Sequence, residues 1–172
     1  MKESLSFATP RFNNTLLDKH YLQATAALYQ DSKVMRLIGD PLSETQSNAV
    51  ASQFLKNNQQ PWPVQKVWAI TSADSDTFCG IQMLRKETGK NEAEIGIILR
   101  REENGRGVAV EAMGALARFG LNTLGLSAIT ATFDKKHLAT KRLVTTLGFE
   151  ESTFVEPKEA DRRFFYYHLK GN

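Results

Sequence analysis

The sequence predicts an α/β fold in which a mixed, mostly antiparallel central sheet is flanked by helices on both faces. Three observations favour this class. Strand-like and helix-like segments follow the order strand, two helices, three strands, helix, strand, helix, two strands. Short polar turns join the three consecutive strands, which is typical of an antiparallel meander. No linker interrupts the chain, so we expect residues 1–172 to form a single domain.

The N-terminal part is expected to supply an extended segment followed by a helix. Leu5–Leu17 has the character of an extended segment, with interruptions predicted at Pro10 and at Asn13-Asn14. Asp18 is a suitable N-cap for the helix that follows, because apolar residues then recur at steps of three and four.

A short apolar turn and a second helix come next. Residues 34–38 are mostly apolar and are ended by Gly39-Asp40-Pro41, which breaks regular structure. Ser43-Glu44-Thr45-Gln46 has the form of a capping box and therefore marks the start of a helix. A loop is predicted from Asn57 onward, because two prolines follow closely.

The rest of the chain alternates between β-rich segments and helices that stop at glycine. The predicted helices are Gly107–Leu124, which ends before Gly125, and His137–Leu147, which ends before Gly148. The predicted strands are Val67–Thr71, Cys79–Leu84, Glu92–Leu99 and Ser127–Phe133, with a closing hairpin of Phe149–Val155 and Arg163–Leu169.

Composition narrows the class of protein. With 41% hydrophobic and 24% charged residues, the chain is typical of a soluble globular domain. A net charge of +3 is too small to indicate nucleic-acid binding, although it suits an anionic ligand. No apolar run is long enough to span a membrane, and Met1-Lys2-Glu3-Ser4 lacks a signal-peptide core, so a cytoplasmic location is expected. The one cysteine, Cys79, has no metal-ligand spacing around it, so no metal is expected.

A glycine turn that opens a helix is the most informative motif. The predicted strand Glu94-Ile95-Gly96-Ile97-Ile98-Leu99 is followed by Asn104-Gly105-Arg106-Gly107-Val108-Ala109. A turn without Cβ atoms lets backbone N–H groups approach a phosphate, and the helix dipole favours negative charge there. An acidic side chain lies on the adjoining strand. The pattern predicts a phosphorylated carrier beside a group that handles protons.

This part of the chain resembles the GNAT superfamily of acetyl-coenzyme A-dependent N-acetyltransferases. The family's phosphate turn has the pattern (Gln/Arg)-x-x-Gly-x-(Gly/Ala), and here Asn104 replaces the usual Gln or Arg. Further on, His137-Leu138-Ala139-Thr140 precedes Leu147-Gly148-Phe149 at the spacing of the family's Asn-x-x-Ser and Leu-Gly-Phe. The N-terminal half, around Asp31-Ser32-Lys33-Val34-Met35 and Gly39-Asp40-Pro41-Leu42, resembles the branch that includes ribosomal-protein N-terminal acetyltransferases.

The resemblance implies acetyl-CoA as a cosubstrate, bound by one continuous set of residues. The amides of the turn would face its diphosphate, with charge added by Arg106. The end of the preceding strand would pair with the pantetheine arm through its backbone. The expected cofactor-binding residues are Ile97, Ile98, Leu99, Asn104, Gly105, Arg106, Gly107, Val108, Ala109 and His137. Lys135, Lys136, Lys141 and Arg142 are candidates for the ribose 3′-phosphate, or form a solvated basic face.

Glu94 is the expected general base. An alkylamine with a pKa of about 10.4 is almost wholly protonated at neutral pH, so a carboxylate that takes the proton is useful. Glu94 resembles the acidic residue that several family members use on this strand; otherwise it is an exposed strand glutamate in an ion pair. Glu92 lies on the same strand face and is the substitute if the register differs.

Two residues of the last helix have both a functional and a structural interpretation. His137 either bonds the pantetheine arm or caps the helix. Thr140 is at the position where related enzymes have a serine near the thiol, so it is either a donor to the leaving sulfur or a surface residue. Many family members place a tyrosine acid where Val144 stands here, so Tyr166 or Tyr167 would have to supply a donor, unless both are core residues.

Two other functions compete with direct acetyl transfer to a primary amine in a ternary complex. A dinucleotide-binding protein would need a third glycine where Val110 stands, and a βαβ unit instead of a meander. A non-catalytic acyl-CoA sensor or partner-binding module on the same fold would explain the atypical Asn104, His137 and Thr140.

The acceptor is the least determined part of the function. The branch resemblance favours the α-amine of a protein or peptide, and small amines such as polyamines stay open. A homodimer is compatible with the resemblance, because dimers are common among relatives. Neither nucleic acid nor a membrane is expected as a partner.

Overall fold

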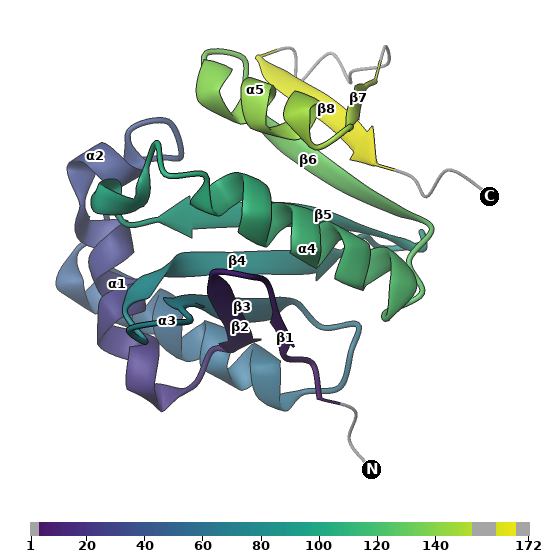
Figure 1. Ribbon diagram of the computed structural model, residues 1–172. Helices are drawn as coiled ribbons and strands as arrows, with labels where there is room; N and C mark the ends of the chain where they lie inside the picture. The colour runs from purple at the N-terminus through teal and green to yellow at the C-terminus, as the bar shows by residue number, and fades with distance from the viewer. Residues whose placement is uncertain (1–3, 153–160, 168–172) are drawn as a thin grey trace.

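The computed structural model describes residues 4–152 and 161–167, coloured along the chain in Figure 1. Its centre is a sheet with the strand order β1-β2-β3-β4-β5-β6-β8-β7. Within it, the only parallel neighbours among the described strands are β5 and β6. The strands are β1 (Phe7–Ala8), β2 (Phe12–Leu16), β3 (Lys66–Ser72), β4 (Phe78–Lys86), β5 (Glu92–Leu99), β6 (Ala128–Asp134), β7 (Glu150–Glu151) and β8 (Arg162–Tyr167).

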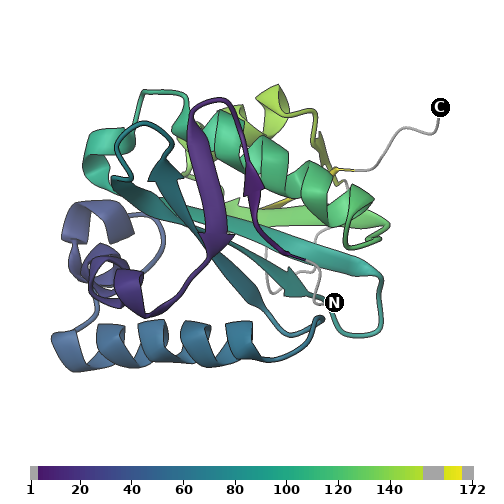
Figure 2. The ribbon, with the colours of Figure 1, turned by 60° about the horizontal axis from the view of Figure 1, so that its bottom comes forward.

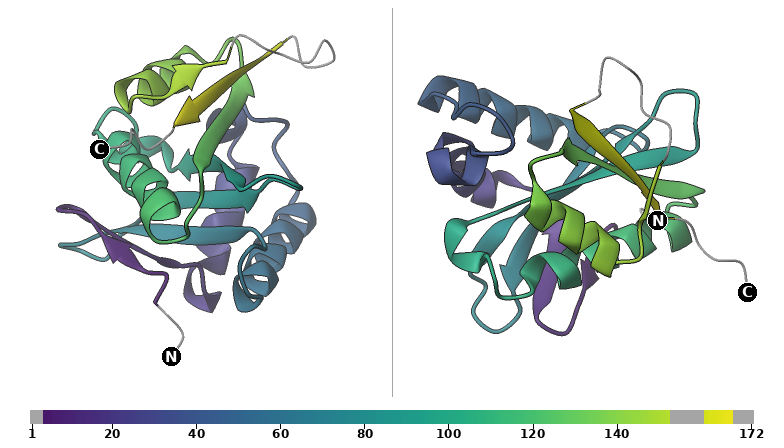
Figure 3. Two further views of the ribbon diagram at one scale, coloured as in Figure 1. Left: turned by 90° about the vertical axis from the view of Figure 1, so that its right-hand side faces the viewer. Right: turned by 90° about the horizontal axis from the view of Figure 1, so that it is seen from above.

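Helices cover both faces of this sheet, as Figures 2 and 3 show. The helices α1 and α3 lie on one face, and α4 and α5 lie on the other. The helical segments are η1 (Lys19–Tyr21), α1 (Leu22–Gln30), α2 (Ser32–Met35), α3 (Glu44–Gln59), η2 (Arg101–Glu103), α4 (Val108–Asn122) and α5 (Leu138–Thr146). The predicted fold class, a mixed and mostly antiparallel sheet between two helical layers, is confirmed.

The two faces of the sheet bury separate apolar clusters because neighbouring strand residues point to opposite sides. Trp68 belongs to the cluster under α4 and α5, together with Leu116 and Val144. Its neighbour Val67 belongs to the cluster under α1 and α3, together with Phe54. Burying one such aliphatic side chain contributes roughly 2 kcal/mol, so both layers are firmly held.

The predicted break at Asn13-Asn14 is wrong. The chain turns at Pro10, as expected, but both asparagines lie inside β2. Asn14 is completely buried, and its Oδ1 accepts a hydrogen bond of 2.8 Å from Gln82 Nε2, which also donates to the carbonyl of Ala112. A polar partner inside the core therefore lets a turn-forming residue occupy a strand.

Three helix boundaries also differ from expectation. Asp18 caps the single turn η1, and α1 begins only at Leu22. The apolar turn predicted over residues 34–38 overlaps the short helix α2, because Asp31 accepts from the N–H groups of Lys33 and Val34. The capping box of α3 is present as predicted, but this helix continues to Gln59. The buried side chain of Lys66 donates to backbone carbonyls at the C-terminal end of α3, including that of Asn57. It therefore satisfies acceptors that a helix terminus leaves free.

The closing hairpin is present in shortened form. β7 contains only Glu150 and Glu151, and it pairs with β8, which lies between β7 and β6. Residues 153–155 and 168–169 of the predicted strands, and most of the loop between them, lie outside the described residues.

The sheet opens between its two parallel strands. β5 pairs with β6 only from Glu92, opposite Ala128, to Glu94, opposite Thr130. β5 nevertheless runs on to Leu99, still paired with β4, while the rest of β6 pairs with β8. The two strands diverge beyond Glu94, toward the side of the molecule where α2 lies (Figure 1). This divergence leaves one edge of the Ile95–Leu99 backbone without a strand partner among the described residues.

Candidate functional site

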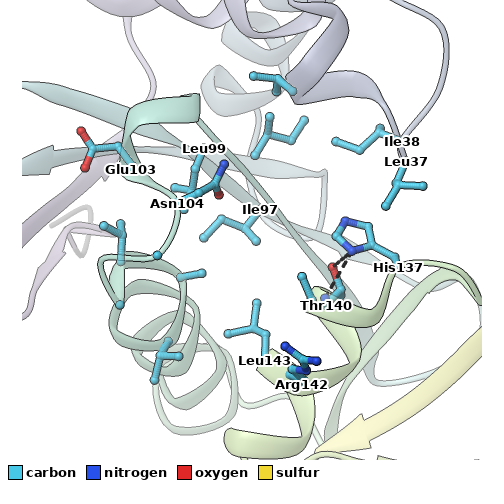
Figure 4. A pocket seen from close by; sticks show the side chains of 18 of the residues that line it. Leu37, Ile38, Ile97, Leu99, Glu103, Asn104, His137, Thr140, Arg142 and Leu143 are labelled. Carbon is cyan, nitrogen blue, oxygen red and sulfur yellow. Dashed lines mark hydrogen bonds between the residues drawn. The ribbon is translucent and has the colours of Figure 1, made fainter.

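A cavity of about 590 Å³ occupies the opening between the diverging strands. Figure 4 shows its lining from close by, with side chains from the α2 region, the end of β5 and α5 facing a common space. The lining residues are Lys33, Val34, Arg36, Leu37, Ile38, Ile97, Ile98, Leu99, Glu103, Asn104, Gly105, Gly107, Val108, Ala109, Val110, His137, Ala139, Thr140, Arg142, Leu143 and Thr146. Nine of the ten predicted cofactor-binding residues are among them.

The glycine turn forms one wall of this cavity. Gly105 and Gly107 have φ values of +79° and +74°, a left-handed backbone conformation that L side chains rarely adopt. Gly107 is the N-cap of α4, whose first helical residue is the buried Val108. The free N–H groups of a helix start therefore lie at the cavity, where the helix dipole favours an anion.

The end of β5 forms a second, largely apolar wall. Ile97, Ile98 and Leu99 all line the cavity, and their backbone has an open edge because β6 has diverged. Backbone N–H and C=O groups on such an edge are available for hydrogen bonds, as they are on any edge strand. An extended ligand carrying amide groups can supply them.

The N-terminus of α5 faces this wall with a linked pair of polar side chains. His137 is the N-cap, and its Nδ1 accepts from the backbone N–H of Thr140 at 3.3 Å and lies 3.0 Å from its Oγ1 (Figure 4). Burial lowers the pKa of His137 below its ordinary value of 6.5, and Arg36 acts in the same direction while Asp134 opposes it. The capping interpretation of His137 is thus realised, and the residue lines the cavity as well.

Cationic side chains outnumber anionic ones around the cavity. Lys33, Arg36 and Arg142 line it, with Glu103 as the acidic member of the lining. Of the four basic residues predicted near the ribose phosphate, Arg142 alone reaches the lining. The balance of charge suits a ligand with several phosphate groups.

Two predicted site residues do not line the cavity. Arg106 lies in the glycine turn, but its side chain is exposed and its carbonyl accepts a hydrogen bond from Arg11. Glu94 lies where β5 leaves β6, and its Oε2 is 3.2 Å from Arg85 Nη2 on β4. The alternative base, Glu92, has a buried Oε2 without a hydrogen-bond partner among the described residues. The roles of Arg106, Glu94 and Thr140 remain predictions.

Val144 is completely buried in the core under α5, so no side chain acts from that position. The side chains of Tyr166 and Tyr167, the other candidate donors, lie outside the described part of the structure.

Sequence reasoning missed the wall that α2 and the following residues provide. The lining residues from this segment are Lys33, Val34, Arg36, Leu37 and Ile38. Figure 4 shows Leu37 and Ile38 on the side of the cavity where His137 lies. The sequence signal was the short apolar run ended by Gly39-Asp40-Pro41, which does not distinguish a cavity wall from a core segment. In the structure, Ile38 lines the cavity with 48% of its surface exposed.

The part of the chain that the structure describes has no helix long and apolar enough to cross a membrane. It also contains no group of three or more His, Cys, Asp or Glu side chains arranged to hold a metal ion.

Comparison with known families identifies the chain. Residues 15–150 match the acetyltransferase (GNAT) domain family, so this protein belongs to that family. The matched region contains the glycine turn, the diverging strands and the start of α5. The dinucleotide-binding alternative is excluded, because the glycine turn follows an antiparallel meander within this fold.

Two bacterial relatives match parts of the sequence. The chain is 32% identical over 81 residues to the uncharacterized N-acetyltransferase p20 of Bacillus licheniformis, a match covering 47% of this chain and 44% of that protein. It is also 25% identical over 135 residues to the uncharacterized N-acetyltransferase YnaD of Bacillus subtilis strain 168, a match covering 78% of this chain and 76% of that protein. The first match therefore spans less than half of that relative.

Solved structures share the fold over almost the whole chain. The spermidine N-acetyltransferase from Vibrio cholerae in complex with CoA and spermine has a TM-score of 0.76 at 16% identity, covering 93% of this chain and 96% of that one. RimL, a ribosomal L7/L12 α-N-protein acetyltransferase in complex with CoA, has a TM-score of 0.77 at 12% identity, covering 94% and 96%. At such low identity these likenesses show the fold alone.

Proposed function

We propose that this protein is an N-acetyltransferase that moves an acetyl group from acetyl-CoA to a primary amine by direct transfer in a ternary complex. The observation that carries the proposal is the cavity between β5 and β6, bounded by a glycine turn on one side and an unpaired strand edge on the other. CoA carries phosphates and an amide-containing arm, and these are the groups that such walls can bind.

The residues present fit this cosubstrate. The N–H groups at the start of α4 would hold the diphosphate, Arg142 would meet a further phosphate, and Ile97–Leu99 would pair with the pantetheine arm. Acetyl-CoA supplies an activated thioester, whose thiolate leaves readily. Asn104 and His137 line the same cavity and are polar contacts for the arm.

The protein's own chemical task is to deliver an unprotonated amine. In the transfer a C–N bond forms, the C–S bond breaks, the amine loses a proton and the thiolate gains one. We assign the removal of the amine proton to Glu94, which would take this proton directly or through water. Thr140 is the candidate donor to the sulfur, and its hydroxyl already contacts His137 Nδ1.

The acceptor class follows from resemblance and not from geometry. We favour the α-amine of a protein or peptide, with polyamines as the other candidate. RimL is described as acting on a ribosomal protein and another fold neighbour as acting on spermidine, which supports an amine acceptor without choosing between the two. The expected cytoplasmic location agrees with either acceptor, and a homodimer is part of the same proposal.

The function is tested by release of free CoA thiol from acetyl-CoA with a panel of acceptors. Peptides beginning in Ser or Ala, and spermidine, are compared with the same peptide already acetylated at its N-terminus. We expect thiol release with at least one free amine and none with the blocked peptide. Tight CoA binding without release for any acceptor would support the non-catalytic sensor instead.

A matched pair of glycine variants tests the site itself. Gly107→Trp should abolish CoA binding in calorimetry, because a side chain strains this left-handed turn and its Cβ would lie 3.2 Å from Arg11 Nη2, so the turn that forms the cradle must shift. Gly89→Trp is the control: Gly89 has a φ of +75°, almost the same as Gly107, but lies in the β4–β5 turn away from the cavity. Retained CoA affinity in Gly107→Trp would reject the assignment.

A further inference from the structure

Arg11, in the turn between β1 and β2, holds the outer side of the glycine turn. Its Nη1 donates to the carbonyl of Arg106 at 3.0 Å. Its Nε donates to Glu111 Oε2 at 2.6 Å, and its backbone N–H donates to Glu111 Oε1 at 2.8 Å. One residue thus joins the loop before α4 to the first turn of that helix.

The N-terminal hairpin is itself anchored where Arg11 needs it. Phe12 is only 6% exposed and belongs to the same buried apolar cluster as Val108 and Ala112 of α4. The carbonyl of Arg11 accepts from the N–H of Ala73 at 2.9 Å, just beyond β3. Because Phe12 is packed in the core and the backbone of Arg11 is hydrogen-bonded to Ala73, the hairpin is anchored independently of the glycine turn, and Arg11 can restrain that turn.

The contact with Arg106 fixes the orientation of a peptide group in the cradle. A trans peptide is planar, so the N–H of Gly107 points opposite to the carbonyl of Arg106. That carbonyl is held toward Arg11, which does not line the cavity, whereas Gly107 does. The Gly107 N–H is therefore kept on the cavity side, where it can donate to an anion.

The contact with Glu111 neutralises a negative charge close to the phosphate cradle. Burial raises the pKa of Glu111, but hydrogen bonds from Arg11 and Thr9 outweigh it and bring the pKa below its ordinary value of 4.5. Glu111 is therefore an anion in the first turn of α4, where a bound diphosphate would be repelled by it. The guanidinium of Arg11 cancels that charge.

We propose that Arg11 is a positioning residue for the acyl carrier, acting through the Arg106–Gly107 peptide and through Glu111 without touching the ligand. This inference depends on the proposed function, since it assumes that the glycine turn binds the diphosphate. It assigns a role in ligand binding to the N-terminal hairpin, which is remote from the cavity in sequence.

The test measures the Kd of CoA by calorimetry in Arg11→Ala, Glu111→Gln and the double variant. Arg11→Ala should raise the Kd about tenfold, because the Arg106–Gly107 peptide is no longer held and the Glu111 carboxylate beside the diphosphate is left uncompensated. Glu111→Gln should change it by less than about threefold, because Arg106 stays held. The double variant should regain part of the lost affinity, since the uncompensated carboxylate is gone. A purely structural Arg11 would give no such recovery.

Lys90→Ala is the matched control, because it also removes one positive charge and one exposed ion pair, with Glu87 at 3.9 Å, but away from the cavity. Its Kd should equal that of the unaltered protein. Equal Kd values for Arg11→Ala and Lys90→Ala would overturn the inference while leaving the function intact. Absence of CoA binding in the unaltered protein would instead overturn the function.

Arg11→Lys is a second test variant, for use if Arg11→Ala does not fold. A lysine ammonium keeps the charge but cannot reach two acceptors with the planar fork of arginine, so a Kd increase of about threefold is expected. If Arg11→Ala does not fold, an unchanged Kd in Arg11→Lys would contradict the proposal.

Discussion

The side chain of Glu94, the proposed base, points to a defined face of the sheet at the place where β5 and β6 separate. Ile95 points into the core under α4, so its neighbour Glu94 points to the face covered by α1 and α3. Glu94 is also the last β5 residue paired with β6, opposite Thr130. A carboxylate at this point can serve an amine that approaches the opening from the α1 and α3 face.

This placement gives a prediction for the base. Glu94→Gln should lower turnover about 100-fold at neutral pH, a usual contribution of general-base catalysis, and leave the Kd of CoA unchanged. The loss should shrink as the pH rises toward the pKa of the acceptor, about 8 for a peptide α-amine and about 10.4 for an alkylamine, because unprotonated amine then becomes available without a base. Steady-state rates across pH, with a separate measurement of CoA binding, check both parts.

Glu92→Gln is the comparison variant for the same experiment. Glu92 points to the same face as Glu94 but lies two residues farther from the opening. We expect it to keep the pH profile of the unaltered protein. If Glu92→Gln carries the loss and Glu94→Gln does not, the base has been assigned to the wrong glutamate.

Among whole elements, α5 depends on a cap that changes with pH. Its N-terminal N–H at Thr140 is satisfied by the neutral imidazole of His137, and burial keeps the pKa of that ring below 6.5. As pH falls below 6.5 the unfolded chain takes up the proton before the folded one does. The contribution of His137 to the free energy of unfolding should therefore be complete above pH 6.5. It should decrease as the pH falls from 6.5 toward the lower pKa of the folded state.

Substitutions at His137 separate the cap from its titration. His137→Asn keeps an acceptor at the N-cap and removes the titrating group, so the decrease on acidification should flatten. His137→Ala loses the cap and should cost about 1 kcal/mol even at neutral pH. Urea unfolding of the three proteins at about pH 8 and about pH 5 measures this, on either side of the ordinary histidine pKa. An equally steep pH dependence in His137→Asn would show that another group is responsible.

At the scale of the whole molecule, the cavity exists only when distant segments are folded together. Its walls come from residues 33–38, 97–110 and 137–146. CoA should therefore bind the folded chain alone, and at 100 times its Kd should raise the free energy of unfolding by about 2.7 kcal/mol. Urea denaturation with and without CoA measures the shift, and an unchanged midpoint at that concentration would contradict it.

Local sequence signals predicted most of the elements that build the site. The strand Glu92–Leu99 has the predicted bounds, and the capping box at Ser43 opens α3 as expected. Errors arose where a long-range contact replaced a local one. Asn14 lies in a strand because Gln82 provides its partner, and α3 is longer than expected because Lys66 binds its terminal carbonyls.

The sequence by itself determined the order of the elements and the glycine turn at the start of α4. These depend on interactions between near neighbours, such as caps, turns and the freedom of a residue without Cβ. Only the tertiary structure decided where β5 and β6 part, that residues 33–38 line the same cavity as His137, and that Arg11 reaches a turn 95 residues away. Such contacts form because both faces of the sheet must be covered, and a local pattern does not reveal which distant segment covers which part.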